Sequence, residues 1–183
     1  MSVGVIILAA GRGTRMKTDR AKVLHEACGR TLLGWAIEAS ASLDPDEIVV
    51  VVGHESEQVT AALPDTAIAA RQEPQNGTGH ATQVGLDAFA LSHETIVVLP
   101  GDMPLIRAET LENLVAAHRD ANAAATVLTV VLDDPSGYGR IIRDGGSIAS
   151  VVEERDTTPE QESVREVNTS VYVYRGDLLS DAL

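Results

Sequence analysis

Residues 3–16 read VGVIILAAGRGTRM, an apolar run that ends at Ala10 and passes directly into a segment with glycine at positions 11 and 13. An uninterrupted run of apolar and β-branched residues of this length is typical of a strand buried on both faces of a sheet. Glycine lets the backbone turn sharply and approach an anion closely, so that main-chain N–H groups can point at phosphate oxygens. The stretch predicts a buried strand followed by a phosphate-binding loop, with an ordinary tight turn as the alternative.

Basic residues are concentrated in and after this turn, at Arg12, Arg15, Lys17, Arg20 and Lys22. The glycine spacing fits neither a Walker A loop, which needs a Gly-Lys-Ser/Thr ending, nor the dinucleotide fingerprint, which needs a third glycine. The spacing therefore excludes these two motifs, and the loop by itself leaves phosphate binding and an ordinary tight turn both open.

The composition predicts a globular cytoplasmic protein. The chain has 183 residues, of which 44% are hydrophobic, and this is enough for one domain with a core. Cys28, the sole cysteine, cannot form an internal disulfide, and no secretory leader or membrane-length apolar run is evident. A formal net charge of −13 disfavours a nucleic-acid partner, because such binding needs many lysine and arginine contacts. We expect a small phosphorylated ligand and no membrane partner.

Strand and helix patterns alternate along the first two thirds of the chain. Strands are expected at residues 3–10, 47–53, 67–70, 95–99 and 124–132, and helical spacing is found at residues 32–37, 59–63, 84–91 and 111–118. This alternation predicts an α/β fold with a Rossmann-like, mostly parallel sheet flanked by helices. From Tyr138 onward the pattern changes to β segments at residues 139–142, 147–152 and 167–174. These segments are expected to make the sheet mixed and to fold over one edge of the ligand crevice.

Polar and glycine-containing segments follow several of the predicted strands. In sheets of this kind ligands bind at the carboxyl ends of the strands. Residues 71–80 are polar and glycine-rich, and Gly101 and Asp102 follow the strand at 95–99. An aspartate that faces bound phosphates is a natural ligand for Mg²⁺. The alternative is that Asp102 only caps a turn or the next helix.

Taken together, these segments resemble the sugar-1-phosphate nucleotidyltransferases. The motifs that carry the resemblance are Leu8-Ala9-Ala10-Gly11-x-Gly13-Thr14-Arg15-Met16, Lys22-Val23-Leu24-His25, Gln72 with Gly77-Thr78-Gly79-His80-Ala81, Gly101-Asp102-x-Pro104-Leu105, Gly137-Tyr138-Gly139-Arg140, Val152-Glu153 and Glu166-Val167-Asn168-Thr169. Within that family the chain is most similar to the uridyltransferase (pyrophosphorylase) domain of bacterial bifunctional N-acetylglucosamine-1-phosphate uridyltransferase/glucosamine-1-phosphate acetyltransferases. The match is collinear over essentially the whole chain.

The resemblance implies a nucleotide-diphospho-sugar transferase fold and a Mg²⁺-dependent reaction of UTP with N-acetylglucosamine 1-phosphate. The products would be UDP-N-acetylglucosamine and pyrophosphate. By analogy, the catalytic residues that face the phosphates are Arg15 and Lys22, and the metal ligand is Asp102. Those that bind substrate are Leu8, Ala9, Ala10, Gly11, Gly13, Lys22, Gln72, Gly77, Thr78, Gly101 and Asp102 for the nucleotide, and Gly139, Glu153 and Asn168 for the amino sugar.

Two positions depart from the family pattern. Ala21 stands where the family usually has proline, and Ser170 stands where members often carry glycine. The resemblance also leads us to expect that residues 1–183 form one nucleotidyltransferase domain, truncated at its C-terminus and without the β-helix acetyltransferase domain. On that expectation Asp102 is the one metal ligand among the residues present, acetyl transfer is absent, and the oligomeric state stays open.

Two other function classes stay open at this point. One is a related nucleotidyltransferase that uses CTP or GTP, because the glycine-rich loop alone is shared by such enzymes. The other is a non-catalytic module that binds a nucleotide sugar without releasing pyrophosphate from UTP.

Overall fold

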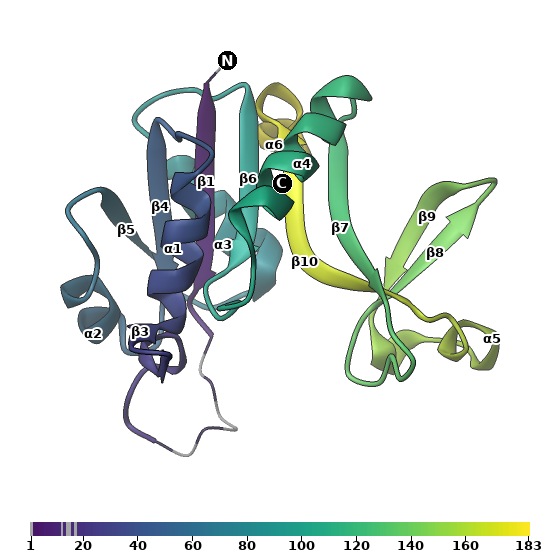
Figure 1. The fold of residues 1–183 in the computed structure, drawn as a ribbon, viewed down its shortest axis with the longest axis horizontal. Helices are drawn as coiled ribbons and strands as arrows, with labels where there is room; N and C mark the ends of the chain where they lie inside the picture. The colour runs from purple at the N-terminus through teal and green to yellow at the C-terminus, as the bar shows by residue number, and fades with distance from the viewer. Residues whose placement is uncertain (1, 12, 14–15, 17) are drawn as a thin grey trace. The chain divides into compact units, whose positions relative to one another are not determined.

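The computed structural model describes residues 2–11, 13, 16 and 18–183 (Figure 1). Its internal contacts divide the chain into two compact units. The first contains the residues up to Thr126 together with Tyr172–Leu183, and the second contains Val127–Val171. Strands β7 (Ala125–Val131) and β10 (Glu166–Arg175) contribute residues to both units.

The first unit contains the predicted α/β sheet, with strand order β5-β4-β1-β6-β10. Its parallel strands are β1 (Val3–Ala9), β4 (Glu47–Val52), β5 (Ala67–Arg71) and β6 (Thr95–Pro100), and β10 runs antiparallel to β6. Each strand bound agrees with the predicted one to within a residue. The prediction of a mostly parallel, mixed sheet flanked by helices is therefore confirmed.

Helices cover this sheet on both faces. They are α1 (Leu32–Ala41), α2 (Ser56–Ala61), α3 (Gly77–Asp87), α4 (Ala108–Asp120) and α6 (Gly176–Ala182). Figure 1 shows α1 in front of the sheet and α3 behind it. A short hairpin of β2 (Glu26–Ala27) and β3 (Arg30–Thr31) precedes α1. Within the described part of the chain, no helix has the length and apolar character that crossing a membrane would need.

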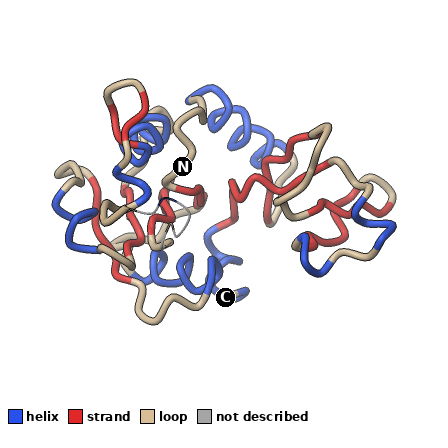
Figure 2. Tube along the Cα trace, turned by 90° about the horizontal axis from the view of Figure 1, so that it is seen from below, coloured by secondary structure: helices blue, strands red, loops and turns tan. Residues whose placement is uncertain are grey.

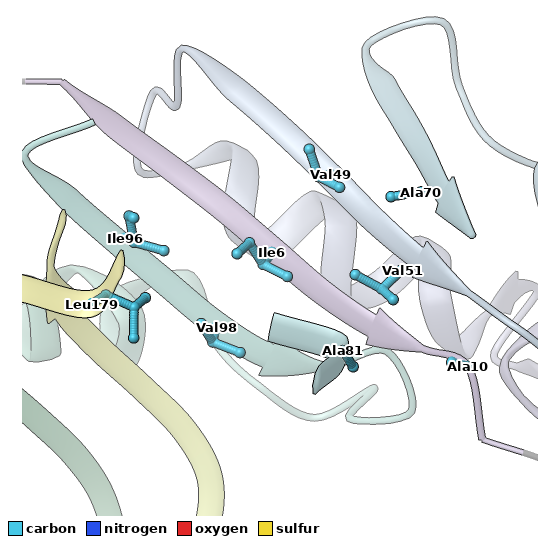
Figure 3. Close-up of a cluster of buried hydrophobic side chains, with 9 residues drawn as sticks. All are labelled: Ile6, Ala10, Val49, Val51, Ala70, Ala81, Ile96, Val98 and Leu179. Atoms are coloured by element: carbon cyan, nitrogen blue, oxygen red, sulfur yellow. The ribbon is translucent and has the colours of Figure 1, made fainter. Parts of the chain in front are cut away.

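The core of the first unit forms around β1, because this strand is hydrogen-bonded on both edges and packed on both faces. Val5, Ile6 and Ile7 are completely buried. One face is closed by a cluster that draws side chains from the sheet, α3 and α6, shown in Figure 3 as Ile6, Ala10, Val49, Val51, Ala70, Ala81, Ile96, Val98 and Leu179. The burial on both faces agrees with the continuous apolar pattern of the strand.

The bounds predicted for the helix over residues 84–91 were wrong. Helix α3 begins at Gly77 and ends at Asp87, and Leu91 lies outside it with 60% of its surface exposed. Its first residues, Gly77-Thr78-Gly79, have low helix propensity, so their sequence gives no helical signal. Helix α6 was not predicted either.

The second unit is built on antiparallel pairs. Strands β8 (Arg140–Asp144) and β9 (Ser147–Val152) form a hairpin, Val167 of β10 pairs with Arg140 of β8, and β7 pairs with β10. Helix α5 (Pro159–Glu162) begins with a capping box between Thr158 and Gln161. The predicted change to β segments after residue 139 is confirmed.

Glu166 ties three strands of the second unit together. Its carboxylate accepts hydrogen bonds from Nε and Nη2 of Arg143 on β8, both at 2.7 Å, and from Oγ1 of Thr129 on β7 at 2.8 Å. These charge-assisted bonds, with the Arg143 guanidinium first and Thr129 adding to it against the opposing effect of burial, lower the pKa of Glu166 to about 2. The side chain of Glu166 therefore stabilises this unit as an anion.

Replacing Glu166 is expected to make stability less dependent on pH. Since the pKa in the folded state lies below the ordinary value of 4.5, the carboxylate stabilises the fold above pH 4.5, and this contribution is lost as the pH falls toward 2. Glu166→Gln should lower the free energy of unfolding at neutral pH by about 1–2 kcal/mol, a value reduced for the solvent exposure of Arg143. Urea titrations at several pH values measure it. Glu162→Gln in α5 is the control, and an equal loss in both variants would contradict the prediction.

Candidate active site

The carboxyl ends of β1, β4, β5 and β6 lie at the same end of the sheet, because the strands are parallel. Figure 2 shows this end of the sheet from below. The backbone pairing continues beyond the strands into the loops. The N–H of Gly101 donates to the carbonyl of Leu8 at 2.9 Å, and the N–H of Gln72 donates to the carbonyl of Val52 at 2.8 Å. The loops that carry the predicted nucleotide-binding residues therefore start from fixed positions.

The glycine-rich turn after β1 packs directly against the predicted catalytic lysine. Gly13 has φ +57°, and the N–H of Met16 donates to its carbonyl at 2.9 Å. A Cβ at Gly13 would lie 2.6 Å from Cβ of Lys22. Glycine is thus needed both for the backbone conformation and for the space that the lysine occupies. Arg15, the other predicted catalytic residue, lies outside the described residues and stays a prediction.

Lys22 and Asp102 form an ion pair at this edge of the sheet. Lys22 opens the 3₁₀ turn η2 (Lys22–Leu24), and Asp102 follows β6. Both side chains are partly buried, with 34% and 28% of their surfaces exposed. The pair brings together two residues that are eighty positions apart in sequence, one predicted to face phosphate and the other predicted to bind metal.

The backbone beside Lys22 is held from α2. Ala21 is buried, and its N–H donates to Oε1 of Gln58 at 3.3 Å, while Nε2 of Gln58 donates to the carbonyl of Asp19 at 3.0 Å. Proline, usual in the family at this position, has no N–H and could not make the first of these bonds. The alanine that replaces the usual proline therefore allows a backbone hydrogen bond to Gln58 that the sequence did not predict.

Asp102 fits a divalent cation, although no full set of protein ligands surrounds it. Among the described residues, no group of three or more His, Cys, Asp or Glu side chains is arranged to hold a metal ion. Mg²⁺ commonly takes one or two carboxylates and completes its shell with water and substrate phosphates. The carboxylate of Asp102 already faces a cation, the Lys22 ammonium, so its position suits positive charge.

A polar cavity of about 480 Å³ lies beside the ends of β4 and β5. It is lined by Gly53, His54, Arg71, Gln72, Glu73, Pro74 and Gln75. Gln72 is 4% exposed, and its Nε2 donates to the carbonyl of Gly77 at 3.0 Å and lies 3.2 Å from Nδ1 of His80. A Cβ on Gly53 would lie 2.9 Å from that of Ala10, so glycine is needed for this close approach.

The start of α3 is open toward solvent. Gly77 has φ +90°, a Cβ there would meet no atom within 4 Å, and the N-cap residue Asn76 makes no side-chain capping bond. The amide groups of the first turn, which include those of Gly77 and Thr78, are left without partners inside the helix. They can bind an oxygen acceptor of a ligand.

The three predicted amino-sugar residues lie together in the second unit. The N–H of Asn168 donates to the carbonyl of Gly139 at 2.9 Å, and a Cβ on Gly139 would lie 3.8 Å from Cδ of Glu153. Gly139 directly precedes β8, Glu153 directly follows β9, and Asn168 is the third residue of β10, so the pairing of these strands brings the three residues together.

Arg140 and Glu154 support this group, and sequence analysis gave neither a role. Arg140 is 3% exposed, and its Nη1 donates to the carbonyls of Pro135, at 2.8 Å, and Tyr138. The carboxylate of Glu154 accepts the N–H of Gly137 at 2.7 Å. The two adjacent glutamates therefore have different roles. Glu154 stabilises the turn before β8, and Glu153 lies beside Gly139 among the predicted amino-sugar residues.

Ser170 has a left-handed backbone, which accounts for the glycine often found at this position in the family. Its φ is +63°, and its N–H donates to Oδ1 of Asn168 at 2.9 Å. This bond orients the side chain of Asn168.

A larger cavity, of about 940 Å³, lies at the amino-terminal end of β6. Its lining includes Phe89, Thr95, His118 and Arg175 and none of the predicted site residues.

Gln72→Leu is expected to destabilise the first unit. The substitution removes the hydrogen bond from the Gln72 amide to the carbonyl of Gly77 and its contact with His80, and should lower the free energy of unfolding by about 0.5–1.5 kcal/mol. Urea unfolding followed by circular dichroism measures the loss. Gln75→Ala, at an exposed position of the same cavity, is the control, and an unchanged stability for Gln72→Leu would contradict the prediction.

Ser170→Gly is expected to stabilise the second unit. Glycine removes the cost of the left-handed conformation, which steric hindrance puts at about 1–2 kcal/mol for other residues. Its greater freedom in the unfolded chain offsets part of this gain, so the net stabilisation should be about 0.5–1 kcal/mol. Thermal unfolding measures the gain. Ser163→Gly, at a residue with φ −74°, is the control and should bring no gain; a loss of stability for Ser170→Gly would show the expectation to be wrong.

Comparison with known proteins shows the family to which the chain belongs. Residues 5–143 match the family model of the MobA-like NTP transferase domain. The chain is 50% identical to "Bifunctional protein GlmU" of Corynebacterium aurimucosum over 97% of its length, and 48% identical to the protein of that name in Streptomyces coelicolor over 98%. It spans 38% of the length of each of these curated relatives.

Solved structures show the same fold at low sequence identity. A UDP-glucose pyrophosphorylase complexed with UDP-glucose matches with a TM-score of 0.80 and 17% identity, covering 98% of this chain and 78% of that one. HddC from Yersinia pseudotuberculosis matches with a TM-score of 0.72 and 18% identity, covering 99% and 80%. Because the family model covers most of the chain and the relatives nearly all of it, this protein belongs to the MobA-like NTP transferase domain family.

Proposed function

We propose that this chain is a uridyltransferase that makes UDP-N-acetylglucosamine and pyrophosphate from UTP and N-acetylglucosamine 1-phosphate. The observation that carries the proposal is the ion pair of Lys22 and Asp102 beside the glycine-rich turn, since it puts a cation and a metal-binding carboxylate where phosphates would lie. Identity near 50% to the GlmU proteins supports the choice within the nucleotidyltransferases.

The residues of the first unit would bind the nucleotide. Gln72 and the open start of α3 at Gly77 and Thr78 offer hydrogen-bonding groups for uracil and ribose. Lys22 and Arg15 would neutralise the phosphates. Asp102 would hold Mg²⁺, which when bound supplies further positive charge at the phosphates.

The reaction needs no covalent intermediate on the protein. An oxygen of the sugar phosphate is already anionic and attacks the α-phosphorus of UTP. The bond from the α-phosphorus to its bridging oxygen breaks, and pyrophosphate leaves with that oxygen. Catalysis then consists of positioning the two substrates and compensating their charge.

The residues of the second unit would select the amino sugar. Asn168 has an amide that can both donate and accept, and Glu153 has a carboxylate that accepts from hydroxyl or amide groups. An N-acetyl sugar presents both kinds of partner. The hydrogen bond from Ser170 to Oδ1 of Asn168 leaves the amide oriented by the backbone.

Pyrophosphate release from UTP and N-acetylglucosamine 1-phosphate in Mg²⁺ buffer tests the proposal. We expect release with UTP and little with CTP or GTP. Asp102→Asn should lower kcat/KM by about 100-fold or more, and Asn168→Ala should raise the KM for the sugar phosphate about tenfold, the loss of one hydrogen bond to the ligand. Asp87→Asn, an exposed carboxylate of α3, is the matched control.

Other outcomes would replace the proposal with one of the two alternatives. Preference for CTP or GTP would identify a related transferase. Binding of UDP-N-acetylglucosamine in a calorimetric titration, without any pyrophosphate release, would identify a nucleotide-sugar binding module.

A further inference from the structure

We propose that Lys22 and the divalent cation compete for the carboxylate of Asp102, so that metal binding releases the lysine toward the phosphates. The inference rests on the proposed function and goes beyond it. Lys22 is then a resident counter-ion as well as a catalytic residue, because it occupies the metal-binding carboxylate until metal and nucleotide arrive.

The ion pair itself is the first observation. Lys22 and Asp102 are in contact while both side chains keep about a third of their surface exposed to solvent. Another cation therefore has access to the carboxylate. At equal distance the carboxylate attracts a divalent cation twice as strongly as a monovalent one, because the Coulomb energy is proportional to the charge.

The second observation is that the lysine can exchange partners without movement of its backbone. Ala21, just before it, is tied to Gln58, and Val23 and Leu24, just after it, are buried. The aliphatic part of the Lys22 side chain packs against Gly13, which has no side chain to obstruct it. The anchored backbone and the unbranched stem confine the exchange to rotation about side-chain bonds.

The third observation is that the ion pair compensates the charge of Asp102. Without Lys22 this carboxylate, which is 28% exposed, would keep an uncompensated, partly buried charge. Lys22 compensates it. When a metal-bound triphosphate enters, the metal takes Asp102, and the phosphates give the released ammonium a new partner, so each event favours the other.

Lysine-selective ¹³C labelling can follow the exchange in the wild-type chain, because its only lysines are Lys17 and Lys22. The Cε signal of Lys22 is assigned with Lys22→Arg, and Asp102→Asn gives the position of the released side chain. We expect Mg²⁺ alone to move the signal of Lys22 toward that position, and potassium chloride at the same ionic strength to leave it in place. An unmoved signal, or an equal effect of potassium chloride, would overturn the inference.

Binding of Mn²⁺ without nucleotide, followed by the electron paramagnetic resonance of the free ion, measures the competition directly. Lys22→Gln removes the competitor and should tighten binding about two- to fivefold, as expected for a partly exposed pair. Arg20→Gln is the matched control, because it removes a nearby charge that pairs with Glu26 at 3.2 Å and not with Asp102. If both variants bound Mn²⁺ more tightly by the same factor, the loss of any positive charge would explain the effect, and the inference would be overturned.

These measurements use metal alone, so they separate the two proposals. Movement of Lys22 without pyrophosphate release from UTP would leave the inference standing and reject the proposed function. Pyrophosphate release with an unmoved Lys22 signal would do the reverse.

Discussion

Burial of β1 between β4 and β6 is the constraint on which the rest of the first unit depends. The strand is hydrogen-bonded along both edges, and its central residues have no exposed surface. A strand in that position can point neither of its faces at a ligand, so chemistry is confined to the ends of the sheet. The glycine-rich turn directly follows β1, so the packing of this strand in the core fixes where the turn begins.

Charge compensation is the second organising feature, and it differs between the two units. In the first unit Lys22 and Asp102 form an ion pair while about a third of each side chain stays exposed to solvent. In the second unit the carboxylate of Glu166 accepts hydrogen bonds from Arg143 and Thr129 and so joins three strands. Charge compensation thus stabilises the fold in the second unit and places an ion pair at the candidate active site in the first.

The strands were predictable because their signal is local. Apolar, β-branched runs bounded by polar segments placed the strands of the main sheet of the first unit to within a residue, whereas the short β2–β3 hairpin was not predicted. The start of α3 was not predictable, since Gly77-Thr78-Gly79 has no helical propensity and is held by the loop after β5. The division between Glu153 and Glu154 also escaped the sequence, because only folding decides which of two adjacent carboxylates meets the N–H of Gly137.

The sequence by itself determined the α/β class, the order of the elements and the identity of the residues at the strand ends, because these follow from hydrophobic period and from motifs within short segments. The tertiary structure decided which of those residues meet. It paired Lys22 with Asp102, placed Gln58 on the backbone of Ala21, and brought Asn168 to Gly139. Such contacts join segments that are far apart in the chain, and strand pairing together with the packing of helices and loops sets the distance between them.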